Sequence, residues 1–130
     1  MVSGNYLLDT NIVIALFAGE PSIIEKLDME NKVFIPAIVL GELYFGALKS
    51  RKVENNILLI DSLAAESMIL ACDKNTAKYY GRIKNNLKKK GKPIPENDIW
   101  IAAVALQHNL ILVSRDTHFK EIDDLTMETW

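Results

Sequence analysis

The first structured pattern in the chain is Tyr6-Leu7-Leu8-Asp9-Thr10-Asn11. A short apolar run that ends in an acid and continues into a helical pattern is typical of a buried strand leading directly into a helix. A related pattern near the other end is Leu110-Ile111-Leu112-Val113-Ser114-Arg115-Asp116. The sequence therefore predicts two buried strands, each followed by a carboxylate.

Strand and helix patterns alternate between these two segments. The residues predicted as buried strands are 6–8, 33–35, 67–70 and 110–113. The residues predicted as helices are 11–17, 22–27, 38–49, 53–62, 75–90 and 98–108. Such alternation predicts an α/β fold with a central, mainly parallel sheet of four to five strands and helices on its faces. The tail 125–130 is a candidate edge strand.

The composition suits one compact domain over residues 1–130, because 49% of the 130 residues are hydrophobic. A single cysteine, Cys72, permits no internal disulfide, and we expect it to be a small buried residue rather than a nucleophile. The first residues lack the basic region of a secretory signal, and the early apolar run 12–18 is too short to span a bilayer. We therefore expect a soluble, cytoplasmic protein without membrane contact.

Four acids occupy positions where a charge is costly, namely Asp9, Glu42, Asp98 and Asp116. Asp9 and Asp116 follow predicted strands, and ligands bind at the carboxyl ends of parallel strands. Asp98 begins a strongly apolar helix. Glu42 lies on a helical stripe expected to face the sheet, together with Ile38, Val39, Phe45 and Gly46. Four buried, unpaired carboxylates are prohibitively unstable unless cations neutralise them, so the sequence predicts a metal site.

Each acid also has a simpler structural explanation. Asp9 and Asp116 suit turns and helix caps, where Asp is favoured. Asp98 suits the positive end of a helix dipole. Glu42 has the alternative of reaching solvent or pairing with a Lys or Arg. The functional interpretation rests on the four acids together.

Oxygen ligands of this kind suit one or two Mg²⁺ or Mn²⁺ ions, whereas zinc normally recruits Cys and His at regular spacing. The two histidines do not have that spacing. His108 ends a predicted helix, where it complements the dipole. His118 is expected in an exposed loop. An acidic site with divalent ions favours hydrolysis of phosphate esters by a water molecule bound to the metal.

The formal net charge of −2 does not exclude a polyanionic substrate, because the remaining surface is slightly basic once four acids are assigned to metal. A candidate rim for the RNA backbone comprises Arg82, Lys84, Lys88, Lys89, Lys90, Lys92 and Arg115. The alternative is a solvated helix whose lysines complement its dipole.

The motifs at residues 7–11, 95–103 and 112–116, with Glu42 between them, resemble the PIN-domain nucleases. They are most similar to the VapC-type toxins of bacterial and archaeal toxin–antitoxin pairs. The resemblance covers essentially the whole chain and implies a PIN-like three-layer α/β/α sandwich. It further implies that Asp9, Glu42, Asp98 and Asp116 bind Mg²⁺ or Mn²⁺ in an enzyme that cleaves RNA.

The resemblance carries further expectations. Asn11 and Ser114 would orient water or substrate, and Ser114 stands where the family often has threonine but keeps the hydroxyl group. Family members commonly form homodimers and are inhibited by a small antitoxin. Candidate aromatic contacts for such partners, which also suit packing within the helices, are Tyr44, Phe45, Tyr79 and Tyr80.

The leading hypothesis is thus a metal-dependent endoribonuclease, in which Asp9 and Asp98 hold the principal ion while Glu42 and Asp116 complete the site. One alternative is an RNA-processing nuclease of the same fold without an antitoxin. Another is a binding protein that contacts RNA or protein without cutting. A phosphatase of the haloacid-dehalogenase kind is disfavoured, because it needs a second acid where this chain has Asn11.

Overall fold

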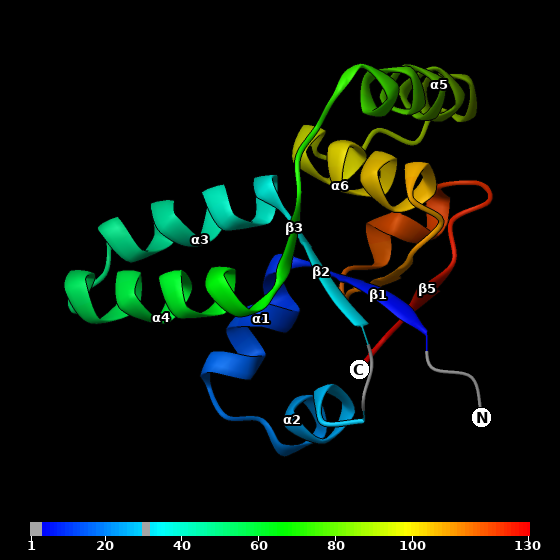
Figure 1. Ribbon diagram of the computed structural model, residues 1–130. Coiled ribbons are helices and arrows are strands. Elements are labelled where there is room, and N and C mark those ends of the chain that lie inside the picture. Colours follow the sequence, from blue (N-terminus) through cyan, green and yellow to red (C-terminus); the bar gives the residue numbers. More distant parts are fainter. Residues whose placement is uncertain (1–3, 30–31) are drawn as a thin grey trace.

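The computed structural model describes residues 4–29 and 32–130. Its centre is one sheet of five parallel strands in the order β3-β2-β1-β4-β5 (Figure 1). The strands are β1 (Asn5–Leu8), β2 (Lys32–Pro36), β3 (Met68–Leu70), β4 (Ile111–Val113) and β5 (Met127–Glu128). The four predicted strands are confirmed, and β5 confirms the expected edge strand in the tail.

Within residues 4–29 and 32–130, six α-helices and one 3₁₀ helix surround the sheet. They are α1 (Thr10–Phe17), α2 (Pro21–Leu27), α3 (Ala37–Leu48), α4 (Val53–Glu66), α5 (Lys74–Lys90), α6 (Glu96–Gln107) and η1 (Thr117–Glu121). Helices α1 and α2 lie on one side of the sheet and α5 and α6 on the other, while α3 and α4 pair and extend beyond it (Figure 1). The predicted three-layer α/β/α sandwich is confirmed.

The neighbouring strands β1 and β4 are buried on both faces. Leu7 and Leu8 of β1 and Leu112 and Val113 of β4 have no exposed surface. Strands covered on both faces need continuous apolar runs rather than alternation, which explains why these segments are recognisable in the sequence. Helix α6 is buried in the same way, since residues 101–105 are at most 1% exposed. The site described below is thus built on rigid, fully packed elements.

Helices α5 and α6 pack against each other, and Asp98 lies in the first turn of α6. The side chain of Asp73 accepts hydrogen bonds from the backbone N–H groups of Asn75 and Thr76, which starts α5. Gly91 ends α5 with a φ of 66°, a conformation in which glycine has no steric penalty. The ring of Tyr80 on α5 stacks on Trp100 of α6 at 4.1 Å between centroids. This packing fixes the start of α6.

Two predictions of burial are wrong. Phe45 and Gly46 do not face the sheet, and Phe45 is 62% exposed, because the far half of α3 packs on α4 beyond the sheet edge. Cys72 is exposed in the connection after β3, the outermost strand on its side. Desolvation and the charge of Asp73 raise the pKa of its thiol, which agrees with the expectation that it is not a nucleophile.

Across residues 4–29 and 32–130, no helix combines the length and the apolar character needed to cross a membrane.

Candidate active site

The site lies where the order of the strands reverses. The chain places β2 and β3 on one side of β1 and then β4 and β5 on the other, so β1 and β4 meet at a switch point. The N–H of Asp9, just after β1, donates to the carbonyl of Val113 at the end of β4 over 3.0 Å. Loops leaving adjacent parallel strands at such a point form the crevice in which α/β proteins bind ligands.

Asp9 is held in a fixed direction by three donors. One carboxylate oxygen accepts from the N–H of Thr10 at 2.9 Å. The other accepts from the hydroxyl of Ser114 at 2.7 Å and from the amide of Asn11 at 3.3 Å. Asp9 is 5% exposed, and this burial raises its pKa, against the hydrogen bonds from Ser114 and Thr10. The charge of Asp116 raises it further.

Ser114 and Asn11 connect the two strand ends. The fully buried Ser114 hydroxyl also accepts from the N–H of Asp116 at 3.0 Å and lies 3.4 Å from the amide nitrogen of Asn11. The amide oxygen of Asn11 accepts from the N–H of Arg115 at 3.2 Å. These two residues, predicted to orient water or substrate, therefore lie between the acids and orient Asp9 and Asp116.

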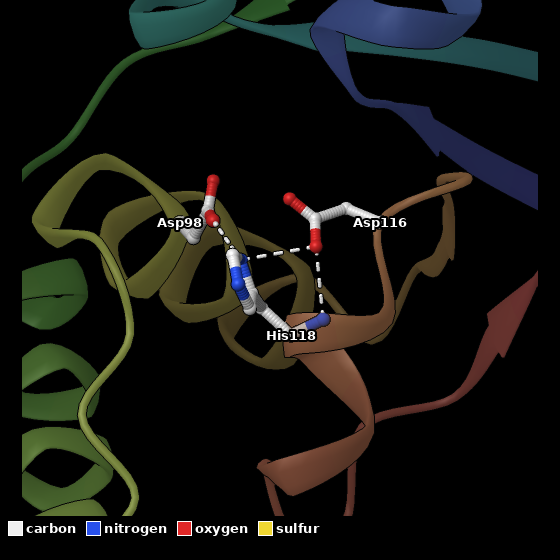
Figure 2. A group of neighbouring side chains, drawn as sticks. All are labelled: Asp98, Asp116 and His118. Carbon is white, nitrogen blue, oxygen red and sulfur yellow. Dashed lines mark hydrogen bonds and ion pairs between the residues drawn. The ribbon is translucent and has the colours of Figure 1, made fainter.

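Asp98 and Asp116 face each other across the imidazole of His118 (Figure 2). Its Nδ1 lies 3.0 Å from an oxygen of Asp116 and 3.5 Å from an oxygen of Asp98. Desolvation, with the charges of Asp9 and Asp116, raises the pKa of Asp98 to about 6, against the effect of His118. One donor atom from each of the three side chains can be chosen so that all lie within 4.8 Å of one another.

Glu42 reaches the site from α3. Its carboxylate accepts a hydrogen bond from the Thr10 hydroxyl at 3.0 Å, and Thr10 is the residue that follows Asp9. Burial raises the pKa of Glu42, the hydrogen bond from Thr10 opposes this, and the charge of Asp9 adds to it. The fold therefore brings the four predicted acids, spread over more than 100 residues of sequence, into one electrostatic cluster.

Three of the acids also have the structural roles expected from the sequence. Asp9 does cap α1, and Asp116 does cap η1 by accepting from the N–H of His118 at 2.9 Å. Asp98 does lie in the first turn of α6. Capping fixes where each of these acids sits, and the tertiary fold places the caps side by side.

The donor set fits a hard divalent cation. None of the described lysines or arginines contributes to the raised pKa values of Asp9, Glu42 and Asp98. Clustered carboxylates repel one another, and a divalent ion removes that repulsion. The side chains whose possible ligand atoms lie within 4.8 Å of one another are Asp98, Asp116 and His118. The hypothesis from the sequence instead had Asp9 and Asp98 hold the principal ion.

Some side chains of the lysine-rich rim pair with acids, and others line a groove. Lys84 pairs with Glu96, Lys90 pairs with Asp123, and Arg115 forms two hydrogen bonds to Glu20, at 2.8 and 3.1 Å. Arg82 lies over the ring of Tyr79. Lys88 and Lys92 instead line a groove of about 310 Å³ beside the start of α6, together with Lys84 and Glu96.

His118 is absent from the ligand set predicted from sequence. Its expected exposure is confirmed, since the side chain is 51% exposed, but it also contacts both Asp98 and Asp116. The available signal was its spacing of two residues from Asp116. His108 is exposed at the other end of α6, as expected for a residue that ends a helix.

Comparison with known proteins places the chain in a family. The pattern of the PIN domain family matches residues 6–125. Ribonuclease VapC2 of Haemophilus influenzae is 40% identical over 128 residues, covering 96% of this chain and 97% of the relative. The tRNA(fMet)-specific endonuclease VapC of Shigella flexneri is 32% identical over 128 residues, with coverage of 96% and 97%.

Among solved structures, VapBC2 from Rickettsia felis, bound to a DNA fragment from the promoter, aligns with a TM-score of 0.90. The sequence identity is 34%, and the alignment covers 96% of this chain and 98% of that chain. Fold, order of motifs and sequence identity all lead to the same assignment. This chain belongs to the PIN domain family and, within it, to the VapC ribonucleases.

Proposed function

We propose that this protein is a metal-dependent endoribonuclease and the toxin of a toxin–antitoxin pair, with Asp9, Glu42, Asp98 and Asp116 as its metal-binding acids. The observation that carries the proposal is the convergence of these acids at the β1/β4 switch point. The raised pKa values of Asp9, Glu42 and Asp98, with the charges of neighbouring acids among their causes, support the proposal. Perturbed carboxylates in a crevice are typical of functional sites.

A bound Mg²⁺ or Mn²⁺ would supply an activated water for attack on phosphorus and would neutralise the charge that develops on the phosphate. The chain's own part is orientation. Ser114 and Asn11 direct the carboxylate of Asp9, and Thr10 directs that of Glu42. Because these supporting donors are in place in the protein alone, the acids need little rearrangement to bind an ion. We propose no covalent intermediate on any side chain.

RNA is the proposed substrate, in line with the ribonuclease and tRNA endonuclease relatives. Lys88, Lys89 and Lys92 are exposed beyond the start of α6 and would contact backbone phosphates. Lys84, Lys90 and Arg115 are engaged by acids and would contribute less. We place the reaction in the cytoplasm, where the RNA targets of such an enzyme are made and used.

An antitoxin partner is proposed from the VapBC complexes and supported by exposed apolar surface. The exposed apolar side chains on α1, α3 and α4 are Ile14, Phe45, Leu48, Leu58 and Leu59. A groove of about 370 Å³ between these helices includes Thr10 and Glu42, so it opens onto the site. Exposed apolar patches of this kind mark protein contacts, with an antitoxin or with a second copy in a homodimer.

Cleavage of a mixed, structured RNA by the purified chain tests the proposal. We expect cuts in Mg²⁺ and in Mn²⁺ that disappear with a chelator and in an Asp98→Ala protein purified in parallel. RNA that is bound but never cut would support the non-catalytic alternative instead.

The toxin assignment has its own test, because an RNA-processing nuclease would have the same site. Expression of the chain should arrest growth, and co-expression of its antitoxin should restore it. Robust RNA cleavage without growth arrest would favour the RNA-processing alternative.

A further inference from the structure

The imidazole of His118 occupies the space between the carboxylates of Asp98 and Asp116 (Figure 2). Asp98 comes from the first turn of α6, and Asp116 and His118 come from the loop and 3₁₀ helix after β4. The side chains of Asp98 and Asp116 are 14% and 30% exposed, whereas that of His118 is 51% exposed. The ring therefore reaches the two acids from the solvent side.

The separations between donor atoms suit a shared cation. Neighbouring ligands of an octahedral ion at about 2.1 Å lie about 3.0 Å apart. Nδ1 of His118 is 3.0 Å from an oxygen of Asp116 and 3.5 Å from an oxygen of Asp98. The three ligand atoms all lie within 4.8 Å of one another, a spacing at which one cation can contact all of them.

The position of His118 is fixed by the backbone. Its N–H donates to the carboxylate of Asp116 at 2.9 Å, which starts η1. The next residue, Phe119, is 1% exposed and anchors η1 in the core. The imidazole is thus directed at the site by a packed element, which favours a ligand over a mobile surface side chain.

We propose that Nδ1 of His118 is a direct ligand of the ion bound by Asp98 and Asp116, and that it biases the site toward Mn²⁺ over Mg²⁺. The inference rests on the proposed metal-dependent function. Mg²⁺ is a hard ion that keeps oxygen ligands and water, whereas transition-metal ions accept imidazole more readily. A nitrogen ligand therefore favours Mn²⁺ in a site that is otherwise built from carboxylates.

Electron spin-echo spectroscopy of the Mn²⁺-loaded protein tests this directly, because it detects ¹⁴N nuclei bound to the metal. The chain has only two histidines. We compare wild type with His118→Asn, which offers an amide oxygen near the place of Nδ1. His108→Asn is the matched control, since residue 108 is ten residues along from Asp98, or about 15 Å along a helix. Calorimetric titration with Mn²⁺ and Mg²⁺ accompanies the spectra.

The expected result is coupling to one directly bound nitrogen in wild type and in His108→Asn, and its loss in His118→Asn. Mn²⁺ affinity should fall by at least about 10- to 100-fold in His118→Asn, because loss of a direct ligand should cost no less than loss of a group that only supports one. Mg²⁺ affinity should change much less. The ratio of Mn²⁺ to Mg²⁺ affinity should therefore fall in this variant alone.

Three outcomes overturn the inference, and they are distinguishable from one another. Mn²⁺ bound without nitrogen coupling, in a protein that cuts RNA, would contradict the role of His118 and leave the proposed function standing. Mn²⁺ and Mg²⁺ that fail to bind at all, in a protein that does not cut RNA, would contradict both. Coupling that persists unchanged in His118→Asn would also overturn the assignment.

Discussion

Two groups of carboxylates in this molecule are in opposite electrostatic states. One group lies on the surface, and each member pairs with a Lys or Arg that lowers its pKa; it comprises Glu20, Glu96 and Asp123. The other group lies in the crevice at β1 and β4, where burial and neighbouring acids raise the pKa; it comprises Asp9, Glu42 and Asp98. The same functional group is thus stabilised at one place and destabilised at the other.

The opposite pKa shifts of the two groups distinguish acids that suit the stability of the fold from acids that suit a function. Exposed ion pairs contribute about 0–1 kcal/mol each and are ordinary features of a surface. A buried acid beside other acids reduces the stability of the fold, so its presence at an otherwise well-packed position indicates use. Removing an acid from each group should therefore have opposite effects on stability and very different effects on activity.

The largest expected effect is on cleavage. Asp98→Asn should reduce the rate of RNA cleavage more than about 100-fold, because it removes a negatively charged ligand that positions the proposed ion. Asp123→Asn, the matched change in the surface group, should leave the rate within about twofold of wild type. Initial rates on one RNA in Mn²⁺, with circular dichroism to verify folding, provide the measurement. Equal rates in the two variants would remove the distinction between the groups.

Ser114→Ala should have the next largest effect. The hydroxyl donates to Asp9 at 2.7 Å and accepts from the N–H of Asp116 at 3.0 Å, so alanine leaves both without that partner. Loss of such supporting groups typically costs 10- to 100-fold in metal affinity or activity, and we expect a loss in that range. Ser50→Ala, which removes a part-buried hydroxyl that donates to the carbonyl of Ala47 and accepts from the amide of Asn56, is the control and should retain activity.

The third prediction concerns pH and the stability of the metal-free protein. Asp98 has a pKa of about 6 when folded, against an ordinary value of 3.8. Between these two pH values the folded chain holds a proton on Asp98 that the unfolded chain has released. The free energy of unfolding that comes from this proton is fully present below about pH 4 and is lost as the pH rises through about 6. Asp98→Asn avoids the loss and should exceed wild type by on the order of 2 kcal/mol at pH 7.

Urea unfolding in chelator at several pH values measures this difference. The advantage of Asp98→Asn should shrink toward zero near pH 4. Asp123→Asn should instead lower stability at neutral pH. Lys90 and Asn86 lower the pKa of Asp123, so they stabilise its charged form in the folded protein, and asparagine loses that stabilisation. A stability difference for Asp98→Asn that stays constant with pH would contradict the raised pKa.

The smallest expected effect is on RNA affinity. In an Asp98→Asn background, Lys88→Ala and Lys92→Ala should each weaken binding a few-fold and reduce the slope of log K against log salt by about 0.7 per lost phosphate contact. Lys90→Ala should change the slope less, because Asp123 already engages that lysine. Fluorescence anisotropy across a salt series gives the slopes. An equal change in the slope for all three variants would show that pairing with Asp123 does not keep Lys90 from contacting RNA.

Much of the fold was predictable because its signals are local. The apolar runs of β1 and β4 reflect strands buried on both faces, and the start of α5 follows from Asp73 and its neighbours. Phe45 was misplaced because a helical stripe does not reveal where a helix leaves the sheet. The 3₁₀ helix η1 was not predicted, since five residues of mixed polarity carry little periodicity.

The alternation of strands and helices, the parallel sheet and the choice of four candidate acids can be read from the sequence, because these depend on neighbouring residues or on the ends of apolar runs. Which groups meet depends on the three-dimensional fold. The bond from Ser114 to Asp9 joins residues 105 positions apart, and the contact of His118 with Asp98 depends on how η1 packs against α6. Hydrogen bonds and pKa shifts act over a few ångströms, and only the fold sets those distances.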